Sequence, residues 1–176
     1  MIPHPVTGQP DFAAGMLSAI PGNGPKPRDH RPRNHSRRHY RTVTADALRR
    51  LGTRFSLLVL SNVDRRSFAR SNRHLGVAFD RIVTAEDVGS YKPSPANFTA
   101  LLAAVDDLGL TPDQLLHVAE SLYHDHVPAH HAGLWSVWIH RRHAVAGFGA
   151  TPPPDVDVTP EWRFESMAAF AAAAGT

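Results

Sequence analysis

The chain has 176 residues, of which 42% are hydrophobic and 20% charged, and these values suit a single globular domain with an ordinary apolar core. It contains no cysteine, which excludes a disulfide framework, a thiolate nucleophile and cysteine-ligated zinc or iron–sulfur sites. Neither a signal sequence nor an apolar run of membrane-spanning length is visible, so we expect a cytoplasmic protein with no membrane partner.

Residues 1–40 differ in composition from the remainder of the chain. They contain seven prolines and carry a net charge of +4, whereas residues 41–176 carry −1. No apolar periodicity runs through this segment, so it cannot bury enough surface to offset the entropy of ordering it. We therefore expect a disordered basic arm at 1–40 and an α/β core at 41–176. Because the core is not basic, nucleic acid is the less favoured partner, and a basic-arm nucleic-acid-binding module stays an alternative.

From residue 44 onward, apolar runs of strand length alternate with segments of helical pattern. The pattern predicts helices over 44–51, 64–75, 94–108, 125–132 and 166–174, and strands over 55–60, 81–84, 115–119, 135–139 and near 162–164. Alternation of this kind is typical of right-handed βαβ crossovers. The sequence thus predicts an α/β fold with a doubly wound parallel sheet.

Polar residues gather where these predicted strands end. Ser61 and Asn62 follow the strand 55–60, Lys92 precedes the helix 94–108, and Glu120 and Asp125 follow the strand 115–119. In a doubly wound sheet, ligands bind beyond the carboxyl ends of the strands, so we expect these side chains to converge at one edge. A hydroxyl, a lysine and a carboxylate pair are the parts of an anion site with optional Mg²⁺. Taken singly, each also has a simpler reading as a helix cap, a solvated lysine or a surface carboxylate.

Three segments in this order resemble the haloacid dehalogenase (HAD) superfamily, and within it the 2-haloacid dehalogenase-like branch. They are Leu60-Ser61-Asn62, the run from Phe79-Asp80 to Tyr91-Lys92-Pro93, and the run from His117 to Asp125 that leads to Val137-Trp138-Ile139. The resemblance covers about residues 43–176. It implies a hydrolase that acts on a small anion, such as a 2-haloacid or a phosphate ester, through an aspartyl intermediate.

The resemblance also implies a role for each matching residue. Ser61, with Asn62 beside it, would bind the substrate's phosphate or carboxylate, and Lys92 would balance negative charge during catalysis. Asp125 would serve catalysis in dehalogenase-type members, which need no metal. In phosphatase-type members, Glu120 and Asp125 would hold Mg²⁺. The oligomeric state stays open, and a homodimer is compatible with the sequence.

The sequence departs from the family pattern at its start. The strand that bears the nucleophilic aspartate and the helical cap that follows it are missing, so the chain reads as N-terminally incomplete. Neither Asp11 nor Asp29 follows an apolar strand. Covalent catalysis in this family requires that carboxylate, and we therefore expect impaired hydrolysis. The alternative is a truncated, non-catalytic domain with residual anion or Mg²⁺ binding.

The missing strand would lie at the centre of the sheet, between the strand that ends at Ser61 and the strand that ends before Glu120. Its absence leaves two buried strands without a partner. Residues 12–20 could replace the missing strand, but they are rich in Ala and Gly and poor in the β-branched residues that central parallel strands favour. We therefore expect the two strands to pair directly or to leave an open groove.

Overall fold

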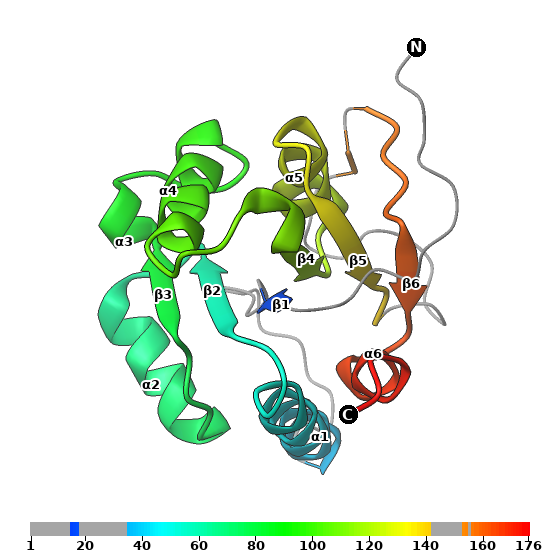
Figure 1. Cartoon of the computed structure of the whole chain (residues 1–176). Coiled ribbons are helices and arrows are strands. Elements are labelled where there is room, and N and C mark those ends of the chain that lie inside the picture. The colour runs from blue at the N-terminus through cyan, green and yellow to red at the C-terminus, as the bar shows by residue number, and fades with distance from the viewer. Residues whose placement is uncertain (1–14, 18–34, 142–152, 155) are drawn as a thin grey trace.

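A computed structural model describes residues 15–17, 35–141, 153–154 and 156–176, with side chains from residue 43 onward. Its elements form a six-stranded, fully parallel sheet of order β3-β2-β1-β4-β5-β6 with helices on both faces (Figure 1). The strands are β1 (Gly15–Leu17), β2 (Leu57–Ser61), β3 (Arg81–Thr84), β4 (Leu116–Ala119), β5 (Trp135–Ile139) and β6 (Trp162–Phe164). The helices are α1 (His35–Leu51), α2 (Arg65–Leu75), α3 (Ala85–Val88), α4 (Pro95–Asp106), α5 (Val127–His131) and α6 (Met167–Ala173), with a 3-10 turn at Pro112–Gln114 and a π-helical turn at Leu122–His126. The predicted doubly wound α/β fold is confirmed.

Two apolar clusters, one on each face of the sheet, form the core. One cluster joins α1 and α6 to β2 and to alternate residues of β4 and β5. The other joins α4 and α5 to β2 and to the residues just before β4 and β5. Leu57 lies in the first cluster, whereas Leu58 and Leu60 lie in the second. In Figure 1, α1 and α6 lie together below the sheet, and α4 and α5 lie above it. Burial on both faces explains why β2 reads as an unbroken apolar run.

Local sequence signals set the helix ends next to the sheet. The Asp64 carboxylate accepts a hydrogen bond from the backbone N–H of Ser67 and caps α2, which ends at Gly76 with a φ of 60°. Thr84 and Asp87 form a reciprocal capping box that starts α3 directly after β3. These caps fix the points at which the chain leaves the carboxyl ends of β2 and β3.

The expectation of direct pairing or an open groove between β2 and β4 is wrong. β1 lies between them and pairs in parallel with both, with Met16 opposite Leu58 on one side and His117 on the other. Backbone groups left unpaired in a dry sheet cost roughly 1–3 kcal/mol each, whereas strand propensities differ by only about 1 kcal/mol. Satisfying the backbone of two buried strands therefore outweighs the poor strand propensity of this segment.

Two elements of the α/β unit include residues before 41, the predicted start of the core. Gly15–Leu17 form a central strand, and α1 begins at His35 rather than at the expected residue 44. The expected disorder of residues 1–14 and 18–34 concerns positions outside the described residues. Within the described part of the chain, no helix is both long and apolar enough to cross a membrane.

Candidate functional site

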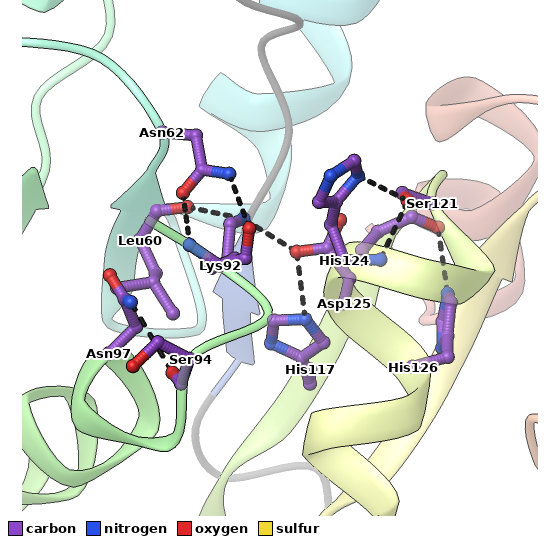
Figure 2. A network of polar contacts seen from close by, with 11 residues as sticks. Leu60, Asn62, Lys92, Ser94, Asn97, His117, Ser121, His124, Asp125 and His126 are labelled. Atoms are coloured by element: carbon purple, nitrogen blue, oxygen red, sulfur yellow. Dashed lines mark hydrogen bonds and ion pairs between the residues drawn. The ribbon is translucent and has the colours of Figure 1, made fainter. Parts of the chain in front are cut away.

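Lys92 lies in the loop between α3 and α4, at the carboxyl edge of the sheet, and only 7% of the residue is exposed. Its ammonium group donates hydrogen bonds to the backbone carbonyl of Leu60, at 3.0 Å, and to the Asp125 carboxylate, at 2.5 Å (Figure 2). The Lys92 side chain thus bridges the end of β2 and the turn that follows β4. Lys92 therefore forms a buried ion pair with Asp125 and is not a solvated loop lysine.

Asn62 fixes the backbone of this loop. Its amide oxygen accepts a hydrogen bond from the backbone N–H of Lys92 at 2.6 Å, and its amide nitrogen donates to the Lys92 carbonyl at 3.0 Å. Two bonds from one side chain to one residue define the position of Lys92 relative to β2. The predicted proximity of Asn62 and Lys92 is therefore present in the structure, and Asn62 has a backbone-clamping role there.

Ser61 is the last residue of β2 and stands between Leu60 and Asn62, both of which bind Lys92. Only 3% of Ser61 is exposed, and its hydroxyl has no hydrogen-bond partner among the described residues. A buried hydroxyl without a partner is costly, and it commonly marks the place of an absent water, ion or ligand. Asp64 rather than Ser61 caps α2, so the simpler interpretation of Ser61 as a helix cap is wrong, and its binding role stays a prediction.

Asp125 belongs to the π-helical turn after β4, and 5% of it is exposed. Burial alone would raise the pKa of its carboxyl, but the Lys92 ammonium and His117 together hold that pKa well below its usual range. Burial lowers the pKa of His117, which is therefore neutral near pH 7. The contact of 3.5 Å between His117 Nε2 and the Asp125 carboxylate is accordingly one of a neutral ring with an anion.

Glu120 follows β4 but makes different contacts. Its carboxylate lies 3.9 Å from the Arg141 guanidinium, and its carbonyl accepts a hydrogen bond from the Trp138 indole N–H. No group of three or more His, Asp or Glu side chains that could hold a metal ion exists among the described residues. Among the described residues the Asp125 carboxylate is bound to Lys92 and Glu120 faces Arg141, and a Mg²⁺ site built on Glu120 and Asp125 stays a prediction.

Two polar residues of this region were not predicted from the sequence. His117 is fully buried in the middle of β4, and Asn97 is buried at the start of α4, where its amide donates to the Ser90 hydroxyl and the Ser94 carbonyl. The signal for His117 was present, because a histidine interrupts the apolar run 115–119. Asn97 gave no such signal, since an asparagine in the first turn of a helix is ordinary.

The described residues bring a cation, a hydroxyl and a carboxylate to the carboxyl edge of the sheet. A buried ammonium and an unpartnered hydroxyl lie at adjoining positions on the carboxyl edge of the sheet. The described carboxylate at the site, Asp125, is bound to Lys92, and β1 is followed in the sequence by Ser18, Ala19 and Ile20 without an aspartate. Asp11 and Asp29 lie outside the described residues.

No protein-family model and no curated protein matches the sequence. Solved structures do match the fold. A HAD hydrolase from Bacillus subtilis bound to magnesium has 19% identity and a TM-score of 0.60, and the match covers 74% of this chain and 53% of that one. A HAD phosphatase from Thermococcus onnurineus has 23% identity and a TM-score of 0.56, with coverages of 75% and 55%.

A 2-haloacid dehalogenase from Pseudomonas syringae pv. Tomato has 25% identity and a TM-score of 0.53, with coverages of 74% and 52%. This chain therefore spans about half the length of each of these structures. The chain has the fold of the HAD-like hydrolases.

Proposed function

We propose that this chain is a HAD-type hydrolase domain that binds a small phosphate or carboxylate at Ser61 and Lys92 and has little or no turnover of its own. The observation that carries the proposal is the buried Lys92 ammonium, held between Asp125 and the carbonyl of Leu60. Leu60 is followed by Ser61, whose buried hydroxyl has no hydrogen-bond partner among the described residues. A buried cation with a neighbouring donor suits recognition of an anion. The absence of an aspartate directly after β1 supports the second half of the proposal.

The proposed partners follow from the same site. The substrate or ligand is a small anion, of either the 2-haloacid or the phosphate-ester class. We propose a cytoplasmic location, because a sequence without cysteine is compatible with a reducing compartment. A homodimer and a nucleic-acid-binding role for the basic arm stay predictions.

Titration of the purified chain with inorganic phosphate and with 2-chloropropionate, followed by NMR, tests the binding half of the proposal. We expect Lys92→Met to weaken binding at least about tenfold, because a charge-assisted bond to the anion is lost. Arg73→Met is the matched control, since it removes one positive charge from an exposed position on α2, and it should leave binding unchanged. Equal loss in both variants would indicate that only the net charge matters.

Lys92→Met alone leaves Asp125 buried and unpaired, which destabilises the fold. The double variant Lys92→Met/Asp125→Asn removes both charges and keeps the test valid if the single variant does not fold. Turnover of 4-nitrophenyl phosphate or 2-chloropropionate, measured with and without Mg²⁺, should stay at background. Turnover in the unmodified chain that Lys92→Met abolishes would contradict the proposal and establish an active hydrolase.

A further inference from the structure

His117 is a polar residue at the centre of the core. It lies in the middle of β4, none of its surface is exposed, and its ring packs against Phe98 of α4 at a centroid distance of 5.3 Å. The ring of His126 lies on another side, at 6.2 Å. Apolar residues of similar size normally occupy such a position, so the histidine requires a physical explanation.

Among the described residues, His117 makes one long polar contact, with Asp125. Its Nε2 lies 3.5 Å from the Asp125 carboxylate oxygen that also accepts the Lys92 ammonium (Figure 2). Neither ring nitrogen has a hydrogen-bond partner within normal distance among the described residues. A buried donor or acceptor without a good bond destabilises the fold, and a fold that keeps one commonly does so for its site.

We propose that His117 is a positioning residue that orients the Asp125 carboxylate from inside the core, so that this carboxylate in turn holds the Lys92 ammonium in place to meet an anion. The proposal deepens the proposed function and rests on it. His117 cannot touch a ligand itself, since it is wholly buried beneath Asp125. It acts through the one oxygen that it shares with Lys92, and a small change in that carboxylate would displace the ammonium.

A merely structural histidine predicts a different response to substitution. If His117 only fills space, leucine should replace it without harm to the site, and removal of two poorly bonded nitrogens should preserve or raise stability. If His117 positions Asp125, leucine should still preserve or raise stability but should loosen the ion pair. A leucine variant that keeps its stability but loosens the ion pair therefore supports the positioning role, whereas one that keeps both supports the space-filling role.

The Lys92 ammonium provides a direct readout, because the chain contains only two lysines, Lys26 and Lys92. Labelling of the lysine side-chain nitrogen with ¹⁵N should give a slowly exchanging ammonium signal for buried Lys92, assigned by its absence in the Lys92→Met/Asp125→Asn variant. We expect His117→Leu to keep or raise the melting temperature, to broaden this signal, and to weaken phosphate binding about tenfold. His117→Gln should restore the Lys92 signal and phosphate binding, because the glutamine amide nitrogen comes close to the position of the histidine Nε2 atom.

Phe98→Leu is the matched packing control. It reduces packing against the same ring without removing a polar atom, so we expect a lower melting temperature and an unchanged Lys92 signal. If His117→Leu does not fold, His117→Met is a second apolar replacement. An unchanged Lys92 signal in a folded apolar variant overturns the proposal. If the unmodified chain binds no phosphate, the anion-binding function fails, while the ammonium signal still tests the role of His117.

Discussion

Lys92 carries a charge that is balanced inside the protein rather than by solvent. Less than a tenth of either side chain of the Lys92–Asp125 pair is exposed. A buried pair of this kind adds little net stability compared with apolar residues, but removal of one partner costs about 3–5 kcal/mol because a charge is left alone. The pair therefore reads as a feature kept for its chemistry, and the fold depends on both members being present.

The buried histidines make stability depend on pH. Burial lowers the pKa of His126 to about 4, and burial also lowers the pKa of His117. Histidine titrates near about 6.5 in the unfolded chain, so between about pH 6.5 and pH 4 the unfolded His126 binds a proton that the folded His126 does not, and the lowered pKa of His117 acts in the same direction just below pH 6.5. We therefore expect full stability above about pH 7 and a loss of at most about 1.4 kcal/mol per pH unit for each histidine as the pH falls through this window.

Urea denaturation at pH 7.5, 6 and 5 measures this loss. His126→Gln should make the dependence shallower, since it removes one titrating ring. The lowered pKa of Asp125 acts in a separate and more acidic range, because its contribution is present above about pH 3.9 and is lost below it. A free energy of unfolding that stays constant from pH 7.5 to pH 5 would show that the two rings are not buried and neutral.

The sequence predicted the residues that stand at strand ends better than those inside strands. Lys92 and Asp125 were predicted to meet because the carboxyl ends of parallel strands share one edge, and they form an ion pair. Glu120 shares that location but faces Arg141, a contact that depends on side-chain direction and not on position along the chain. His117 was missed because it stands inside the predicted strand 115–119, and candidate site residues were sought only at the ends of strands.

At the scale of elements, the loop between α3 and α4 is held by side chains that flank it. Asn62 binds the backbone of Lys92 from the end of β2, and Asn97 binds Ser90 and Ser94 from the start of α4. The loop therefore needs no regular structure to present Lys92 in one position. Its order comes from hydrogen bonds to two rigid neighbours.

Asn62→Leu should release this loop. The backbone N–H of Lys92 loses its acceptor, so we expect its hydrogen exchange to accelerate at least about tenfold and phosphate binding to weaken. Asn72→Leu is the matched control, because the Asn72 amide donates to the Val77 carbonyl in another part of the molecule. Exchange at Lys92 that is unaffected by Asn62→Leu, or equally affected by both variants, would exclude the clamping role.

Elements marked by an apolar run were predictable, whereas α3 and β1, which have no such run, were not. β2, β4 and β5 were each marked by such a run, and β3 and β6 by shorter ones. α3 has only four residues, about one turn, which is too short to show a helical period, although its capping box was present in the sequence. β1 has three residues with little β propensity, and its two neighbours, rather than its own sequence, make it a strand.

At the scale of the whole molecule, the sheet is continuous because β1 lies between β2 and β4 and pairs with both. A chain that begins at residue 35 lacks this strand, and we expect it to lose about 3 kcal/mol of stability or more, since backbone groups of two buried strands lose their partners. A chain that begins at residue 11 keeps β1 and is the control. Urea denaturation of the two should differ clearly; equal stability would mean that β1 contributes nothing to the sheet.

The position of β1 also constrains the order in which the protein can fold. β1 is the first strand in the chain, yet it pairs with β4, whose Leu116 lies opposite Gly15 and about 100 residues later in the sequence. During synthesis, β1 therefore cannot pair with β4 until most of the polypeptide has been made. Contacts this distant in sequence slow folding, because a long loop must close before they form. We therefore expect the centre of the sheet to be the last part of the molecule to assemble. Until it does, two strand edges are unpaired and can pair with other chains.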